Sequence, residues 1–571
     1  MSDSGWSMYI FRDGRRTASG RELVASLCSA LCRWQLAAEQ SAEDLAVLAL
    51  IAAGELECAL LDGANESGVA DSATADSPIH HSTKHHPATP DLQTQAAEIT
   101  DAVAWAFLTG QRGSLSTILQ RAGQIRAEST YTVAVQEGFA YYALHPRKVA
   151  MLLEGLELGT RVAVLGIRSI GVTLSAVACA ALRLRGVECE RITARPQGHP
   201  YDRKLEATAE LERFAGRWHG AEFLIVDEGP GISGSSFLAM AEALQACGIE
   251  SSRIHLVGSR EAAPATLLAE NAAVRWPRFQ FHRMENAPLP PRQAGESLSG
   301  GAWRRHFRCE EHYTPASWTP LEPAKFLAED ERSVFRFEGY GHYGEEIGAR
   351  AMLLAARGYS PRYLGNHCGF GEYERAEGRM LTLCDRSREM LRYMAEYLAW
   401  RAEAFQSEGQ APELEEMLRW NWQAEFDEEL RAEEWQLPAV RVALCDGRMM
   451  PHEWLLTTRG EMLKLDAVSH GDNHFFPGPC DIAWDVAGAI VEWEMLGQVR
   501  ERFVGEYEAR SGDAVSERLA PYLRAYAIFR LGWCRMAALA MQGEFDEALL
   551  ERDYQRYRTL AVHLRSRAKA A

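Results

Sequence analysis

The chain has 571 residues, 61 basic and 79 acidic side chains, and a formal net charge of -18 at neutral pH. This charge excludes a general affinity for nucleic acid or anionic membrane, because both require a basic surface. One hydrophobic core stops growing near about 250–300 residues, so the length indicates two or three domains. The composition, 47% hydrophobic and 25% charged, is that of a globular protein.

Cysteine usage and the absence of apolar runs indicate where the protein resides. The 12 cysteines are scattered without a C-x-x-C pair, which favours reduced thiols over a disulfide framework. A helix needs about 20 apolar residues to span a bilayer, and no apolar run in the sequence approaches that length. The first residues lack the pattern of a signal peptide. We expect a soluble, cytoplasmic protein that does not bind membranes. The sequence does not indicate its oligomeric state.

Residues 1–110 are predicted to form a helical N-terminal extension. Apolar residues recur with helical spacing over 23–36 and again over 45–61. Ser19 and Glu22 have the spacing of a capping box before the first of these helices. Residues 62–95 are small and polar, and this composition predicts a mobile loop.

Residues 111–330 are predicted to form a domain in which strands alternate with helices. This alternation indicates right-handed β-α-β units and a parallel sheet. Ligands of such sheets bind beyond the carboxyl ends of the strands. The predicted strands cover 161–166, 188–194, 223–226 and 253–258, the helices cover 173–184 and 237–247, and a connecting segment follows over 287–325.

Two adjacent acids, Asp227 and Glu228, directly follow the apolar strand 223–226. Buried acids are costly unless they meet donors or cations, and ribose hydroxyls and hydrated Mg²⁺ are suitable partners. The turn 229–236 adds hydroxyls, backbone amides and a helix N-terminus, which together can bind phosphate. A purely structural helix-capping turn is the alternative.

These residues resemble the signature of the type I phosphoribosyltransferases, an apolar strand followed by two acids and a phosphate-binding turn. The resemblance implies that Asp227 and Glu228 hold the ribose hydroxyls of phosphoribosyl pyrophosphate (PRPP) during catalysis. Glu228 stands where the family more often has Asp, and the turn is one residue longer than usual. The residues implied to bind the 5-phosphate are Gly231, Ser233, Gly234, Ser235 and Ser236.

A second segment, 164–173, resembles the pyrophosphate loop of the same family, a strand that ends in a glycine-bearing turn before a helix. The resemblance implies that Arg168 and Ser169 contact the pyrophosphate and that Arg195, after the next strand, adds a further contact. The segment 136–142 is expected to form part of a hood on the acceptor side.

Residues 331–571 contain a further pair of acids, Asp446 and Asp466, 20 positions apart in the sequence. Between them, the alternating stretches 454–457 and 462–465 predict a hairpin that brings both acids to one end. In phosphoryl transfer, one acid orients the acceptor hydroxyl while another binds Mg²⁺. A long helical stretch is predicted over 386–433.

This arrangement resembles the aminoglycoside-phosphotransferase and protein-kinase-like family, in which a catalytic Asp, a hairpin and a metal-binding Asp follow one another. The resemblance implies a catalytic role for Asp446 and a metal role for Asp466, with His452 in place of the family's Asn as a further metal ligand. The family has a lysine in its first strand. This sequence has none there, and Arg336 is the nearest cation. The resemblance also extends to a glycine-rich stretch and a structural acid pair, namely Gly339, Gly341, Gly344, Asp481 and Asp485.

These features predict a multidomain α/β plus α+β protein: a helical N-terminal extension (1–110), a parallel-sheet phosphoribosyltransferase-like domain (111–330) and a kinase-like domain (331–571). The expected function is transfer of phosphoribose from PRPP to an unidentified small acceptor, with Mg²⁺ as cofactor. A phosphotransferase step with ATP in the kinase-like domain stays open. So do a non-catalytic sensor of PRPP or nucleotide and the reverse, bond-cleaving direction.

Overall fold

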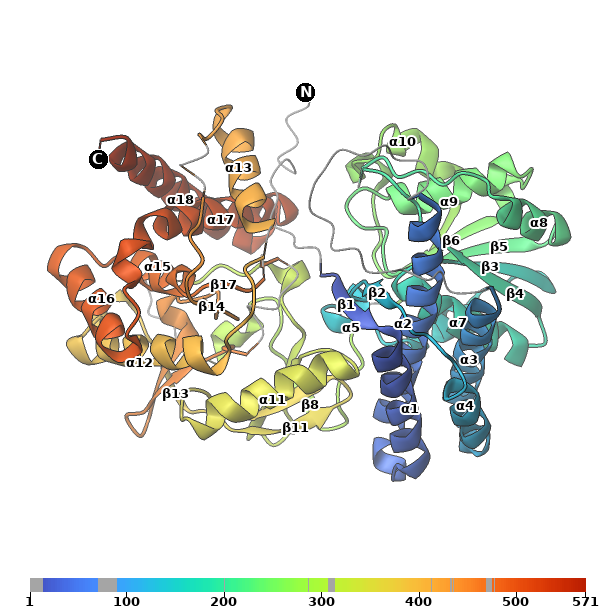
Figure 1. Ribbon diagram of the computed structural model, residues 1–571, viewed down its shortest axis with the longest axis horizontal. Helices are drawn as coiled ribbons and strands as arrows, with labels where there is room; N and C mark the ends of the chain where they lie inside the picture. Colours follow the sequence, from blue (N-terminus) through green and yellow to red (C-terminus); the bar gives the residue numbers. More distant parts are fainter. Residues whose placement is uncertain are drawn as a thin grey trace. The chain divides into compact units, whose positions relative to one another are not determined.

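The computed structural model (Figure 1) describes the whole chain except residues 1–13, 70–89, 200, 286, 307–313, 412, 432–433, 435, 469–474, 477 and 571. The described chain forms two compact units. Unit 2 comprises residues 14–290 and the short segment 339–344, and unit 1 comprises residues 291–338 and 345 onward. The N-terminal helices therefore belong to the same unit as the predicted α/β domain.

Unit 2 is built on a five-stranded sheet in the order β4-β3-β5-β6-β7. All neighbouring strands are parallel, which confirms the predicted parallel sheet. Strands β3, β5 and β6 are buried along nearly their whole length, as expected where helices cover both faces. The bounds are β3 Arg161–Ile167, β4 Glu188–Ala194, β5 Glu222–Val226, β6 Ile254–Gly258 and β7 Gln280–Arg283.

The helices of unit 2 begin largely where the sequence predicts. The Ser19 and Glu22 capping box is present at the start of α1. The loop predicted over 62–95 is too long, because α2 continues to Val69, with its end held by ion pairs of Asp62, and α3 already begins at Pro90. Residues 70–89 lie outside the described residues. The bounds are α1 Gly20–Leu36, α2 Ala42–Val69, α3 Pro90–Thr109, α4 Leu115–Ala122, α6 Arg147–Gly155, α7 Ile170–Leu184, α8 Ala209–Arg217, α9 Ser235–Ala246 and α10 Ala272–Arg275.

Buried ion pairs attach the N-terminal helices to the sheet. Arg191 on β4 donates to the Glu57 carboxylate on α2 at 2.8 Å and pairs with Asp101 on α3 at 2.5 Å. Truncating one partner of a buried pair is strongly destabilising, so these contacts bind the helices firmly to unit 2. Short elements complete the unit: β1 Arg16–Ser19 pairs with β2 Thr130–Val133, and α5 spans Glu137–Ala140.

Unit 1 contains an antiparallel five-stranded sheet in the order β11-β12-β10-β9-β8. Strand β8 lies in what the sequence predicts to be a connecting segment, and β9 begins at the end of that segment. Both strands are short; β8 pairs with β9 and β9 pairs with β10, and this pairing comes from tertiary structure rather than local pattern. The bounds are β8 Ala294–Ser297, β9 Lys325–Ala328, β10 Ser333–Phe337, α11 His342–Ala356, β11 Tyr363–His367 and β12 Phe370–Glu374.

The remainder of unit 1 is mainly helical. The long helical stretch predicted over 386–433 consists of two helices: α12 ends at Ala404 and α13 begins at Glu413, because the intervening sequence contains the helix breakers Gly409 and Pro412. The hairpin predicted between the two acids is confirmed. The bounds are α12 Arg388–Ala404, α13 Glu413–Phe426, β13 Gly378–Met380, β14 Val442–Ala443, β15 Trp454–Thr457, β16 Met462–Lys464, β17 Cys480–Asp481, α15 Ala483–Glu492, α16 Gly497–Ser511, α17 Leu519–Ala540 and α18 Phe545–Ala570.

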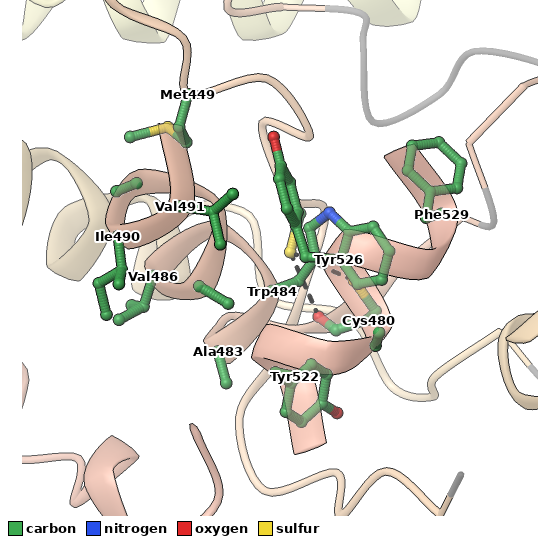
Figure 2. Close-up of a cluster of buried hydrophobic side chains, with 14 of the residues drawn as sticks. Met449, Cys480, Ala483, Trp484, Val486, Ile490, Val491, Tyr522, Tyr526 and Phe529 are labelled. Carbon is green, nitrogen blue, oxygen red and sulfur yellow. Dashed lines mark hydrogen bonds between the residues drawn. The ribbon is translucent and has the colours of Figure 1, made fainter. Parts of the chain in front are cut away.

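Trp484 of α15 lies at the centre of the helical core, with Tyr526 and Phe529 of α17 beside it (Figure 2). Its ring centroid lies 5.7 Å from that of Tyr526 and 5.4 Å from that of Phe529, both in edge-to-face geometry. Such pairs stabilise a core beyond their burial of area. No helix within the described ranges is long and apolar enough to cross a membrane.

Candidate functional site

The first candidate site lies in unit 2, at the carboxyl ends of β3 and β5. The strand order reverses between these two neighbours, since β4 lies beyond β3 and β6 lies beyond β5. Parallel sheets bind ligands at such a switch point, where the loops from the two strands separate to opposite faces. The loop after β3 contains Arg168 and Ser169, and the loop after β5 contains the acids and the turn 229–236.

Glycines fix these loops close to one another. A Cβ atom on Gly171 would lie 2.7 Å from the carbonyl oxygen of Val226, and one on Gly258 would lie 1.9 Å from that of Gly229. Only glycine allows these approaches. Ser169 has a φ of 113°, rare for a residue with a side chain, and its hydroxyl donates to the Val135 carbonyl at 3.2 Å. Strain of this kind clusters at functional sites.

Asp227 and Glu228 both have raised pKa values. Burial raises the pKa of Asp227 to about 7, and the negative charge of Glu137 contributes. Burial also raises the pKa of Glu228 well above its usual range, with Glu137 and Asp227 adding to the effect. The Glu228 carboxylate accepts a hydrogen bond from the Gly138 amide. Clustered acids with shifted pKa values in a ligand-binding position mark a candidate functional site.

The turn before α9 forms a set of amides at the N-terminus of that helix. Gly231 and Gly234 have φ values of 59° and 69°, the left-handed conformation that favours glycine. Ser235 N donates to the Ser233 hydroxyl at 3.2 Å. Among the described residues, none accepts a hydrogen bond from the amides of Gly231, Ile232 or Ser236. These amides and the Ser236 hydroxyl are therefore available to an anion.

The two arginines assigned to pyrophosphate are paired within unit 2. Arg168 Nη1 lies 3.3 Å from Asp62 Oδ1, and Arg195 Nη2 lies 2.6 Å from Asp62 Oδ2. Asp62 stands on α2, more than 100 positions earlier in the chain, so nothing in the local sequence indicates it. Both guanidinium groups pair with the Asp62 carboxylate. A phosphorylated ligand that binds these arginines has to share them with Asp62 or displace Asp62 from them.

The predicted hood segment 136–142 contacts the loop after β5, and the residue directly before it contacts the loop after β3. Gly138 donates to Glu228, and the Val135 carbonyl accepts the Ser169 hydroxyl. Its Gln136 amide donates to the Tyr343 hydroxyl at 3.0 Å, and that hydroxyl donates to Glu55 at 3.0 Å. Tyr343 belongs to the segment 339–344, which contains the glycine-rich stretch of the kinase resemblance. In the structure this stretch joins β10 to α11.

The second candidate site lies in unit 1, where the hairpin separates the two predicted acids. Asp446 is completely buried: its Oδ1 lies 3.3 Å from Lys464 Nζ, and the Tyr397 hydroxyl donates to its carboxylate. Asp485 accepts the amides of Asp446 and Gly447 at 2.7 and 2.9 Å. Asp485 thus fixes the backbone of this loop, while Asp446 faces protein cations.

Asp466 lines a cavity of about 210 Å³ within unit 1. Lys325 Nζ on β9 lies 2.6 Å from its Oδ2, and Arg336 Nε on β10 lies 3.3 Å from its Oδ1. Both cations line the same cavity. Arg336 was recognisable from the sequence, whereas Lys325 and Lys464 were not. The position of both lysines inside strands, where side chains alternate, is the local signal that they point inward.

His452 is surrounded by cations rather than by further metal ligands. Burial, together with the charges of Arg448, Lys464 and Arg530, lowers the pKa of His452 to about 3. Its ring stacks on Trp303, with centroids 6.5 Å apart. Within the described ranges, no group of three or more His, Cys, Asp or Glu side chains is arranged to hold a metal ion.

No known family and no curated protein matches the sequence. Solved structures are similar over about half of the chain, and three of them serve as examples. They are a choline kinase from Streptococcus pneumoniae (13% identity, 48% of this chain and 95% of that chain, TM-score 0.33), an ethanolamine kinase from Plasmodium vivax (12%, 43% and 82%, 0.32) and an aminoglycoside phosphotransferase, itself of uncertain assignment, from Ralstonia eutropha (15%, 47% and 97%, 0.33).

These similar structures are kinase-like enzymes, but TM-scores this low decide neither fold nor activity. What the two sites can do therefore follows from their own residues. Unit 2 presents paired acids beside open amides at a switch point, and unit 1 presents an acid held by two cations inside a cavity.

Proposed function

We propose that unit 2 is a phosphoribosyltransferase that transfers phosphoribose from PRPP to a small acceptor. The convergence of the loops after β3 and β5, with Asp227 and Glu228 beside the open amides of the turn, supports this proposal. In the reaction the bond from ribose C1 to pyrophosphate breaks and a bond from that carbon to the acceptor forms. Pyrophosphate leaves, and the acceptor loses a proton.

Each group has a role that follows from its chemistry. Ionised Asp227 and Glu228 accept hydrogen bonds from the ribose hydroxyls, and the turn 231–236 binds the 5-phosphate through amides and hydroxyls. Both carboxylates are hard oxygen donors, and together with the phosphates of the substrate they fit Mg²⁺, which supplies positive charge to the leaving group. The protein contributes mainly positioning and electrostatic stabilisation.

Arg168 and Arg195 are the proposed contacts to pyrophosphate, with Ser169 beside them. Their shared partner Asp62 competes with the ligand for both guanidinium groups. Arginine pairs readily with phosphate through paired hydrogen bonds, so an incoming pyrophosphate can take over these donors. Asp62 then keeps the arginines in place before the ligand binds.

Turnover tests this function directly. Purified protein with PRPP, Mg²⁺ and a pool of small nucleophiles should release pyrophosphate, and Asp227→Asn/Glu228→Gln should reduce the rate by at least about 100-fold. Glu206→Gln, a change at an exposed position outside the site, serves as the control. Release that persists in the double variant contradicts the assignment. PRPP binding without any release favours the sensor function instead.

A second function, in unit 1, is supported by the cavity that contains Asp466, Lys325 and Arg336. A cation pair beside a carboxylate suits ATP with Mg²⁺, where Asp466 holds the metal. Phosphoryl transfer also requires Asp446 to reach an acceptor hydroxyl, and the burial of Asp446 against Lys464 favours nucleotide binding without transfer. The proposed cofactor is therefore ATP, either as phosphoryl donor or as signal.

The two roles of unit 1 differ in their response to Asp446→Asn. If unit 1 transfers phosphate, this variant loses ATP consumption and keeps ATP binding. If unit 1 only binds nucleotide, the wild type consumes no ATP and the variant binds it unchanged. Asp466→Asn should weaken Mg²⁺-ATP binding in either case.

A further inference from the structure

Arg530, on α17, is a buried cation that has neither a hydrogen-bond acceptor nor an ion-pair partner among the described residues. The residue is 5% exposed, and its Nε atom is buried and forms no hydrogen bond. In the part of the chain that the structure describes, no residue accepts a hydrogen bond from its guanidinium or forms an ion pair with it. Burying an unpaired charge is expensive, so its position needs an explanation.

Aromatic rings hold the guanidinium in place without neutralising it. The guanidinium carbon lies 4.6 Å from the centroid of the Trp533 ring and 5.3 Å from that of Tyr557. The carboxylate of Glu492, which acts on Arg530 from a greater distance, already accepts the hydroxyls of Tyr526 and Tyr557 at 2.7 and 2.6 Å. Cation–π contacts offset only part of the cost of burying a charge.

Arg530 lines the cavity of unit 1, and two further donors line it nearby. Trp318 is 5% exposed, its indole Nε1 has no hydrogen-bond partner, and its ring lies 5.2 Å from that of Trp533. The guanidinium of Arg448 lies 5.5 Å from the Trp533 ring, and its ion pair with Glu453 is long, at 3.6 Å. The depressed pKa of His452 reports the same concentration of positive charge.

We propose that this end of the cavity binds the oxyanion group of a small ligand, a carboxylate or a phosphate, through Arg530 with Trp318 and Arg448. A bound oxyanion pairs with the buried guanidinium in a bidentate manner and accepts the indole N–H, which satisfies both groups. The Trp533 ring, which both guanidinium groups contact, provides an apolar surface for the body of the ligand. This inference depends on neither activity proposed above.

Arg535 offers a matched control. It stands on the same helix, its guanidinium also lies over an aromatic ring, at 5.2 Å from Tyr554, and it does not line the cavity. Arg530→Met should raise the melting temperature of the ligand-free protein by about 2–4 °C, because it removes an unpaired buried charge. Arg535→Met should leave the melting temperature nearly unchanged. A lower melting temperature for Arg530→Met indicates a structural role and overturns the proposal.

The ligand arm titrates inorganic phosphate, ribose 5-phosphate and benzoate into intact protein at constant ionic strength. At least one should raise the melting temperature of the wild type and of Arg535→Met by a few degrees but not that of Arg530→Met. The effective probe distinguishes a phosphate from a carboxylate ligand. Phosphate binding by unit 2 raises the melting temperature of the wild type and of both variants equally, so it does not affect the difference between them. Equal shifts in all three, or none in the wild type, overturn the proposal.

Discussion

At the scale of single residues, both candidate sites hold charges that the fold does not fully compensate. Asp227 and Glu228 have raised pKa values because burial and mutual repulsion disfavour their ionised forms. Arg530 is buried, and no described residue forms an ion pair with it. Proteins retain such charged groups where a ligand supplies the missing partner. Substituting such a group then stabilises the ligand-free protein and abolishes ligand binding.

The pH dependence of the stability of Asp227→Asn tests whether burial disfavours the ionised form of Asp227. The folded-state pKa of Asp227 is about 7, above its value in the unfolded chain, so the folded protein binds more protons between these values. Ionisation of Asp227 therefore lowers the stability of the wild type as pH rises from about 4 to about 7. The free energy of unfolding of the variant, relative to wild type, should increase over this window in urea titrations. A flat difference would show that Asp227 is not desolvated.

Asp485 is also a buried acid, and burial raises its pKa to about 6, but its carboxylate accepts two backbone amides that the protein supplies. Asp485→Ala leaves the amides of Asp446 and Gly447 without an acceptor, so the free energy of unfolding should fall by about 2–4 kcal/mol. Tryptophan fluorescence in urea measures it. Asp330→Ala, in an exposed turn of the same unit, should change it by less than about 0.5 kcal/mol. Equal effects would contradict the structural role of Asp485.

At the scale of elements, glycines rather than charged residues determine how the loops of unit 2 meet. Gly258→Ala places a methyl group against the Gly229 carbonyl and should displace the loop that carries Glu228. We expect a loss of about 1–3 kcal/mol in stability and about tenfold in PRPP affinity. Gly155→Ala, where nothing lies within 4 Å, is the control and should change neither. Calorimetric titration measures the affinities, and unchanged binding in Gly258→Ala contradicts the close approach.

The sequence predicted the elements of the parallel sheet well because their signals are local. Apolar runs at 161–166 and 223–226 and capping at Ser19 were sufficient for confirmed strands and a helix start. The partners that decide the chemistry are remote: Asp62 pairs with arginines more than 100 positions away, and Lys325 reaches Asp466 across 141 positions. Local periodicity does not encode such pairings. The breaks at Gly409 and Pro412 were visible in the sequence but were outweighed by the flanking helical pattern.

At the scale of the whole molecule, the chain does not divide at the predicted boundaries. The helices of 1–110 that the structure describes join the sheet of unit 2, and the segment 339–344 returns to unit 2 from within the C-terminal part. Domain boundaries predicted from composition assume that each domain is one continuous stretch of sequence. The composition of a segment as short as 339–344 does not show that it belongs to the other unit. The candidate site of unit 2 is therefore held in place by residues from both parts of the sequence.

Tyr343→Phe tests this dependence. The variant loses the hydroxyl that accepts from Gln136 N and donates to Glu55, so the hood above Glu228 should loosen. PRPP affinity should fall several-fold, with about 1–2 kcal/mol lost from stability, while ATP affinity stays constant. Tyr393→Phe, which removes hydroxyl bonds to Met462 and Gly358 within unit 1, should leave PRPP affinity unchanged. Equal effects on PRPP would refute a positioning role for Tyr343.

The central claim is that the acid pair and the turn of unit 2 bind PRPP. Calorimetric titration of PRPP with Mg²⁺ into the intact wild type and into Asp227→Asn/Glu228→Gln tests it most directly. We predict one binding event per chain in the wild type and a loss of at least about tenfold in affinity in the double variant, which is still folded and at least as stable above pH 7. No binding to the wild type, or equal binding to both proteins, would contradict the claim.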